Sequence, residues 1–179
     1  MPTDVRGYIA ALVAREGGYT ADSADPGGAT CWGITEPVAR AYGYEGAMQD
    51  LPVTTAEAIY LAQYWHRPHL DRLDAIDSEL AAKLLDTGVN MGPQTAVRYL
   101  QRALRVLVDA GASLAVDGDL GPLTLHALQV FLYQRGDDGR AVLLGMIRGQ
   151  QSVGYIGLAE ATPAERKFEY GWQKQRALL

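Results

Sequence analysis

The sequence has a single cysteine, no long apolar run and no excess of positive charge. Because Cys31 is the only cysteine among 179 residues, an intramolecular disulfide and a zinc site made of several cysteines are both excluded. No stretch approaches the roughly 18 uninterrupted apolar residues of a membrane-spanning helix, and the N-terminus lacks the basic start and apolar run of a secretory signal. We therefore expect a protein that is synthesised in the cytoplasm without a signal peptide and does not enter a membrane.

Positive charge is also scarce relative to negative charge. The 16 lysines and arginines are outnumbered by 21 aspartates and glutamates, which gives a formal net charge of -5. A protein of this sign has no overall field that attracts nucleic acid or anionic lipid, so neither is expected as a partner.

The sequence does have an ordinary globular composition, with 48% hydrophobic and 21% charged residues, and a dominant helical periodicity. Thr3 and Asp4 form a cap signal before the first helix, and Thr54-x-x-Glu57 matches a capping box before the third. The expected helices cover about residues 5–16, 36–43, 55–66, 78–90, 93–109, 122–134, 138–148 and 163–177. The predicted fold is therefore mainly α, with at most a small β-hairpin near residues 19–34.

Glu16 stands at the junction between the first helix and a turn-rich stretch. Gly17-Gly18 ends the helix directly after it, which places a carboxylate beside an ordered loop. Hydrolysis of a glycosidic bond needs a carboxylic acid next to the leaving oxygen and a second polar group, and the loop offers Asp22, Asp25 and Thr30. Periodicity alone nevertheless favours a solvated glutamate at a helix end, followed by an ordinary tight turn.

Three motifs in the first half resemble a known family, and this resemblance favours a catalytic role for Glu16 over a solvated surface position. They are, in chain order, Glu16-Gly17-Gly18-Tyr19, Asp25-Pro26-Gly27-Gly28-Ala29-Thr30 and Trp32-Gly33-Ile34-Thr35. Their order and spacing resemble the N-terminal signature of glycoside hydrolase family 108, a family of N-acetylmuramidases from phage and prophage endolysins. The resemblance continues through Tyr64-Trp65 and through the segment from Asp86 to Pro93.

The second half resembles the small peptidoglycan-binding region that is usually fused to this family. The motifs that carry this resemblance are Ala96-Val97-Arg98-Tyr99-Leu100-Gln101 and the turn-rich segment from Val116 to Thr124. There is no repeat, and the only soft joint is the short interval 108–115. We therefore expect a catalytic muramidase region over residues 1–92 and a helical peptidoglycan-binding region over residues 93–179, packed as one compact unit.

The resemblance assigns Glu16 the role of proton donor to the glycosidic oxygen. Phage-type lysozymes more broadly carry a glutamate, an acidic residue nine positions later and a threonine shortly after, and the similar arrangement here implies that Asp25 and Thr30 hold the attacking water, with Asp22 as the alternative to Asp25. Whether Asp25 acts as base, nucleophile or positioning group stays open. The implied reaction is hydrolysis of the β-1,4 bond between N-acetylmuramic acid and N-acetylglucosamine by a lysozyme-like enzyme, without a metal or any other cofactor. Two alternatives stay open, which are cleavage by transglycosylation and a non-catalytic peptidoglycan-binding or structural protein.

The resemblance also implies where the protein acts. Its partner is peptidoglycan, which it reaches in the periplasm or on the cell wall after release through a holin or a secretion system, and we expect a monomer. Bacterial walls carry anionic polymers, so the net charge of -5 is unexpected unless the protein has a local cationic face.

Further candidates for substrate contact are Trp32, Tyr64 and Asn90, together with Asp22. An aromatic ring can pack on the apolar face of a sugar, which suits Trp32 and Tyr64, although hydrophobic anchoring explains Trp32 equally well. The amide of Asn90 suits an N-acetyl group, although capping of a helix end is the simpler explanation.

Cys31, His66 and His69 are not expected to carry chemistry. The two histidines lack a third ligand, and Pro68 interrupts the helix between them, so no metal site is expected. Cys31 is a departure from the resembled family, in which this position is often polar or basic. No histidine stands near it in the sequence to activate its thiol, so we expect Cys31 to pack in the core.

Overall fold

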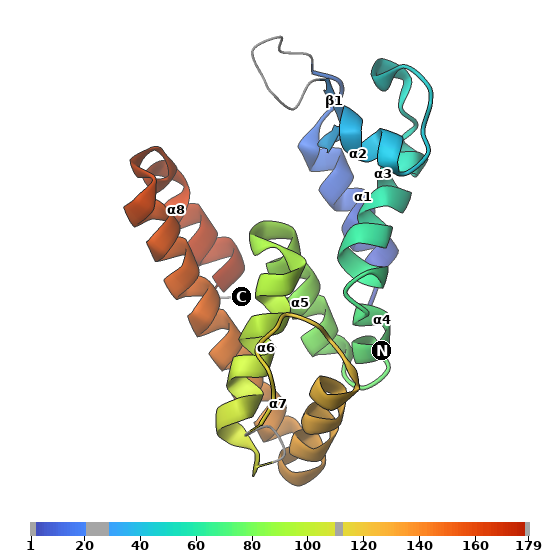
Figure 1. Cartoon of the computed structure of the whole chain (residues 1–179). Helices are drawn as coiled ribbons and strands as arrows, with labels where there is room; N and C mark the ends of the chain where they lie inside the picture. The colour runs from blue at the N-terminus through green and yellow to red at the C-terminus, as the bar shows by residue number, and fades with distance from the viewer. Residues whose placement is uncertain (1–2, 21–28, 110–112, 178–179) are drawn as a thin grey trace. The chain divides into compact units, whose positions relative to one another are not determined.

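The computed structural model describes residues 3–20, 29–109 and 113–177, and the structural statements below concern these residues. The chain divides into two compact units, which we call the N-terminal unit (residues 4–67) and the C-terminal unit (residues 68–179 with residues 1–3). Helices dominate both, and the strands of the described part form one two-stranded sheet (Figure 1). The prediction of a mainly α, lysozyme-like fold with a small hairpin is confirmed.

The N-terminal unit is built around the helix pair α1 and α3. Its elements are α1 (Val5–Glu16), β1 (Thr30–Cys31), β2 (Ile34–Thr35), α2 (Glu36–Ala41), the 3-10 turn η1 (Met48–Asp50), α3 (Val53–Leu61) and the π-helical turn η2 (Ala62–His66). α1 packs along α3, as Figure 1 shows. The core between them includes Ile9, Leu12, Val13, Ala56 and Ile59.

α1 begins and ends where its sequence predicts. The carboxylate of Asp4 accepts a hydrogen bond from the Gly7 N–H at 3.0 Å, which caps the first turn. Gly17 follows the last residue with a φ of 83°, a conformation that stops a helix and that glycine adopts at little cost. Glu16 is thereby held at the end of a rigid element.

The predicted capping box before α3 is wrong. The helix begins at Val53, and its N-cap is Pro52, which has no side-chain hydrogen bond to offer. Instead the Pro52 carbonyl accepts hydrogen bonds from the N–H groups of Thr55 and Ala56, at 2.9 and 3.1 Å. Proline fixes φ at a value compatible with helix entry, so the helix starts early and Thr54 lies inside the first turn.

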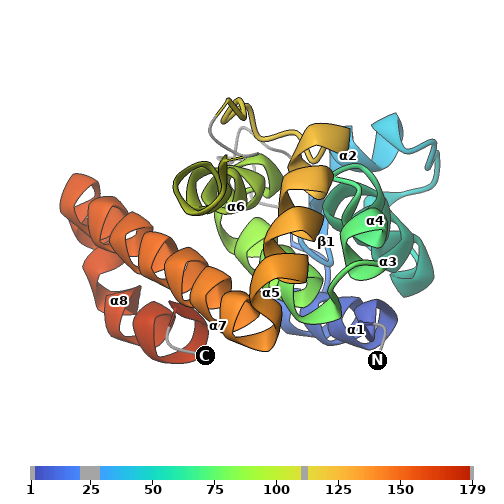
Figure 2. The ribbon, with the colours of Figure 1, turned by 90° about the horizontal axis from the view of Figure 1, so that it is seen from below.

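The C-terminal unit is a helical assembly in which α6 packs against both α5 and α7, and Figure 2 shows these helices from below. Its elements are α4 (Leu70–Asp74), α5 (Ser78–Met91), α6 (Pro93–Leu107), α7 (Pro122–Ala161), the 3-10 turn η4 (Pro163–Glu165), α8 (Arg166–Trp172) and the π-helical turn η5 (Gln173–Ala177). Its core is made mainly of leucines, among them Leu80, Leu84, Leu100, Leu104, Leu128 and Leu143.

α7 is longer than the sequence periodicity predicts. The predicted break near residue 136 exists as a kink at Gly136, with φ of 55° and ψ of -142°. The helix after this kink runs to Ala161 instead of ending near residue 148. Buried Ile147, Gln151 and Tyr155 continue its inner face every fourth residue, and Tyr155 stacks on Trp172 at 5.2 Å.

Gln101 holds the loop that precedes α7 and has only 1% of its side chain exposed. Its amide nitrogen donates to Asp117 Oδ1 at 2.8 Å and to the Asp119 carbonyl at 2.9 Å. Its amide oxygen accepts from the Gly118 N–H at 2.9 Å. A single buried amide of α6 therefore supplies several of the hydrogen bonds that hold the turn motif of residues 117–124.

Gln101→Leu is expected to lower the free energy of unfolding by about 2–4 kcal/mol, because it leaves several part-buried donors and acceptors of this loop unpaired. Chemical denaturation followed by circular dichroism measures the change. Gln129→Leu is the control, since Gln129 is exposed in the same unit, and it should change stability by less than about 0.5 kcal/mol. Equal stability of the two variants would mean that Gln101 does not hold the loop.

Candidate functional site

Glu16 lies at the C-terminal end of α1 with its side chain exposed. Its neighbour in space is Gly33, which stands in the turn of the hairpin. A Cβ atom added at Gly33 would lie 3.1 Å from both Cβ and Cγ of Glu16. The carboxylate is thus presented beside the turn.

The hairpin turn consists of Trp32 and Gly33, which join β1 to β2. The strands pair antiparallel, with Cys31 opposite Ile34. Both turn residues have positive φ, 54° at Trp32 and 72° at Gly33, which is the backbone of a two-residue type I′ turn. A tryptophan seldom takes this conformation, so the surroundings must hold it there.

Two hydrogen bonds hold the turn in place. The indole N–H of Trp32 donates to the Leu51 carbonyl at 2.9 Å, and the Tyr60 hydroxyl donates to the Trp32 carbonyl at 3.3 Å. The first bond links the turn to the end of η1 and the second links it to α3. Trp32 is half-buried in this position, so its indole anchors the hairpin.

Tyr60 and Tyr64 form a stacked pair beside Glu16. Their ring centroids are 5.7 Å apart and their planes differ by 20°. Burial raises the pKa of Tyr60 to about 12, and the negative charge of Glu16 and then Tyr64 add to this shift. The pKa of Tyr64 is also raised, first by burial and then by the charge of Glu16. Both phenols are therefore protonated at neutral pH.

Tyr64 lies in the π-helical turn η2, which continues α3. Such π-turns inside helices are rare and are frequent at functional sites. The described residues thus bring Glu16 next to the turn that holds Trp32, and Tyr64 joins them through its stacking on Tyr60.

Thr30 is placed in β1, two residues before the turn. Its hydroxyl lies 2.6 Å from that of Thr20, and the backbones of the two threonines exchange hydrogen bonds of 2.8 and 2.9 Å. Thr20 therefore extends the small sheet on the side of Thr30. Asp22 and Asp25, the other predicted residues of this loop, lie outside the described residues.

Asn90 belongs to α5 of the C-terminal unit and is exposed. Its side-chain nitrogen donates to the Asp86 carbonyl, one turn earlier, at 2.6 Å. The amide oxygen of Asn90 is not used in this bond and is an acceptor.

Gly33 and Tyr60 belong to the site but were not among the residues predicted from the sequence. Tyr60 is 7% exposed, as expected for a core residue, but its hydroxyl also reaches the turn. The signal for Gly33 was the Trp32-Gly33 pair between two short β-prone segments, which is the length of a type I′ turn. No sequence signal marks Thr20 as the partner of Thr30.

Cys31 is 2% exposed, and burial raises the pKa of its thiol. Its side chain is buried, as expected, and is not a thiolate at neutral pH. Within residues 3–20, 29–109 and 113–177, no cluster of three or more histidine, cysteine, aspartate or glutamate side chains could hold a metal ion. No helix in these ranges combines the length and apolarity that crossing a bilayer requires.

The described part of the site thus holds one carboxylate, Glu16, at a helix end beside a hairpin turn and a tyrosine pair, in a mainly α, lysozyme-like fold. Residues 9–92 match the family Glycosyl hydrolase 108, and residues 95–177 match the family Predicted Peptidoglycan domain. Residues 9–92 therefore form a glycosyl hydrolase family 108 region, and residues 95–177 form a peptidoglycan-binding domain. The chain is a glycoside hydrolase that acts on peptidoglycan.

A solved structure supports the fold. SagA from Brucella abortus is similar to this chain with a TM-score of 0.62 and 24% sequence identity, over 97% of this chain and 95% of that chain. No curated protein matches the sequence at a significant level.

Proposed function

We propose that the protein is an N-acetylmuramidase that hydrolyses the β-1,4 bond between N-acetylmuramic acid and N-acetylglucosamine, with Glu16 as the general acid. The observation that carries this proposal is the position of Glu16 at a rigid helix end, against Gly33 and beside protonated Tyr60 and Tyr64. A carboxylic acid in this place can give its proton to the glycosidic oxygen as the bond to the sugar breaks.

The attacking water is held by residues of the segment that precedes the hairpin. Thr30 supplies a hydroxyl whose orientation is fixed by Thr20 at 2.6 Å, and Asp25 is the proposed carboxylate that holds the attacking water with it. Asp22 is the alternative for the role of Asp25. A separation of about 5 Å between this carboxylate and Glu16 would favour retention of configuration, and about 6.5–9.5 Å would favour inversion.

Trp32, Tyr64, Asp22 and Asn90 are the proposed substrate contacts. Tyr64 is half-buried and stacks on Tyr60 with one face, so the rest of its ring can meet a sugar. The exposed Asn90 offers an amide oxygen to an N-acetyl group. Catalysis is assigned to residues 1–92 and wall binding to residues 93–179, in a monomer that needs no cofactor.

The site of action follows from the substrate. We place the protein in the periplasm or on the cell wall, after release from the cytoplasm by a holin or a secretion system, as in phage endolysins. Lysis of bacteria would be the biological result of the cleavage.

Mass spectrometry of the fragments released from purified sacculi tests the reaction. Hydrolysis by a muramidase leaves N-acetylmuramic acid at a reducing end, which borohydride converts to muramitol. Anhydro-muramic ends would instead identify a transglycosylase, and reducing N-acetylglucosamine ends would identify a glucosaminidase. Absence of any cleavage by the folded wild-type protein would leave a non-catalytic binding protein as the explanation.

A further inference from the structure

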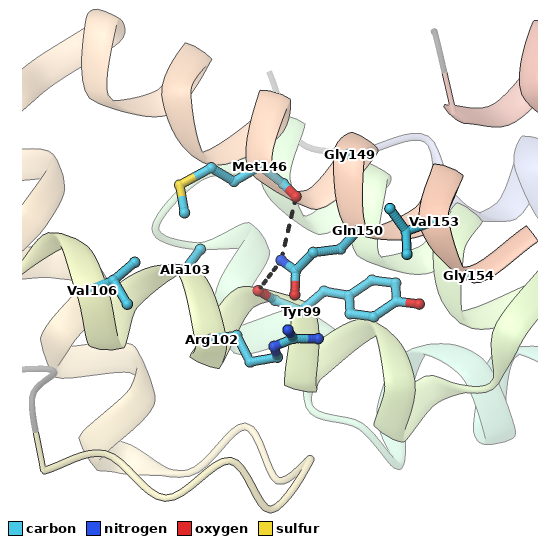
Figure 3. A pocket seen from close by; sticks show the side chains of 9 residues that line it. All are labelled: Tyr99, Arg102, Ala103, Val106, Met146, Gly149, Gln150, Val153 and Gly154. Carbon is cyan, nitrogen blue, oxygen red and sulfur yellow. Dashed lines mark hydrogen bonds between the residues drawn. The ribbon is translucent and has the colours of Figure 1, made fainter. Parts of the chain in front are cut away.

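A groove of about 680 Å³ runs between α6 and α7 in the C-terminal unit. Its lining residues all belong to these two helices, as Figure 3 shows. Two valines, Val106 and Val153, lie on its sides with 74% and 68% of their surface exposed. Exposed apolar side chains that line a concave surface are typical of a binding site.

Gln150 spans the floor of this groove. Its side-chain nitrogen donates to the Tyr99 carbonyl at 2.9 Å and to the Met146 carbonyl at 3.3 Å, which fixes the orientation of the amide (Figure 3). Its buried amide oxygen has no hydrogen-bond partner among the described residues. A buried acceptor without a donor costs free energy, so an N–H group brought into the groove would be stabilised there.

The groove holds one cationic group, although the whole chain is acidic. Its lining includes Arg102 and no aspartate or glutamate. Arg102 is exposed, and no described carboxylate forms an ion pair with it. The groove therefore favours a ligand with a carboxylate.

The lining does not suit a sugar chain. Sugars pack on exposed aromatic rings, but Tyr99, the one aromatic residue of the lining, is only 8% exposed. The peptide part of peptidoglycan has the matching chemistry, because it combines free carboxylates, amide N–H groups and the methyl groups of alanine.

We infer that the groove between α6 and α7 binds the stem peptide of peptidoglycan. Arg102 binds a carboxylate of the peptide, Gln150 accepts a hydrogen bond from a peptide N–H, and Val106 and Val153 contact alanine methyl groups. This inference rests on the proposed function only in that peptidoglycan is the ligand, and it does not depend on the role of Glu16.

Gly149 allows the groove to be filled without disturbing the fold. It is exposed in the groove wall, and a Cβ atom added there meets nothing within 4 Å. Gly145, one turn earlier on α7, is also exposed and equally open, but does not line the groove. Phenylalanine at Gly149 would occupy the groove, whereas phenylalanine at Gly145 is the matched control.

The experiment measures binding of the full-length chain to purified peptidoglycan sacculi on ice, in the background of Glu16→Gln. Gly149→Phe and Arg102→Gln are each expected to weaken binding about tenfold, and Gly145→Phe should stay within about twofold of the parent. Free stem peptide should compete with sacculi for the parent protein. Glycan strands stripped of peptide by an amidase should bind poorly.

Three results would overturn the inference. They are unchanged binding by both groove variants, an equal loss with Gly145→Phe, and equal binding to peptide-free glycan strands. Failure of the proposed function is measured separately, because it would appear as cleavage of sacculi by the Glu16→Gln variant. The binding of the groove variants relative to their parent protein tests the groove whether or not Glu16 is catalytic.

Discussion

Glu16→Gln is expected to lower the rate of peptidoglycan cleavage by about 10²–10⁴-fold, the usual contribution of a general acid. Glutamine has nearly the shape of glutamate but no acidic proton, so it cannot protonate the glycosidic oxygen. The side chain is exposed at the helix end, so the substitution should leave folding intact. Release of reducing ends from sacculi measures the rate, and circular dichroism with thermal unfolding checks the fold.

Glu45→Gln is the control for this prediction. Glu45 is an exposed glutamate of the same N-terminal unit and lies in a loop outside the hairpin site, so its loss changes the charge by the same amount. The rate should stay within about twofold of the wild-type rate. Equal rates for Glu16→Gln and the wild-type protein would remove Glu16 from the reaction and leave the family assignment of the fold untouched.

Local signals predicted the framework of the site. Asp4 and Gly17 mark the two ends of α1 in the sequence, and both act in the structure as their chemistry predicts. The turn-forming residues near 19–34 predicted the hairpin, which occupies residues 30–35 with Thr20 bridged to it. Such features depend on neighbours a few residues away, which is why they can be predicted from the sequence alone.

Contacts between distant residues could not be predicted in this way. The Tyr60 hydroxyl meets a carbonyl 28 residues away, and the Gln101 amide fixes a loop 16 to 18 residues further on. The helical periodicity placed Tyr60 and Gln101 in helices, but it did not predict which polar atoms their side chains would bind. The wrong capping box of α3 has the same origin, because Thr54 has the right spacing but Pro52 already starts the helix.

The groove between α6 and α7 is a further feature that depends on distant residues. The net charge of -5 argued against a strongly cationic wall-binding protein, and only the packing of α6 against α7 shows that exposed Arg102 lies in a groove whose lining contains no carboxylate. The lining residues of the two helices are far apart in the sequence, so neither segment alone predicts the groove.

Gly33→Ala is expected to reduce the turnover number by about 10²-fold, because displacement of a reacting group by about 1 Å has an effect of this size. The added Cβ would lie 2.6 Å from the Tyr60 hydroxyl and 3.1 Å from the side chain of Glu16, so one of them must move. The positive φ of 72° adds backbone strain of about 1–2 kcal/mol, which thermal unfolding should detect.

Gly43→Ala separates this crowding from the strain. Gly43 has a φ of 97°, and a Cβ atom there meets nothing within 4 Å, so the variant should lose similar stability but keep its turnover number within about twofold. In Gly33→Ala combined with Tyr60→Phe the 2.6 Å contact disappears, and part of the turnover lost in Gly33→Ala should return. Similar turnover numbers for Gly33→Ala and Gly43→Ala would show that the space between Glu16 and Tyr60 has no role in catalysis.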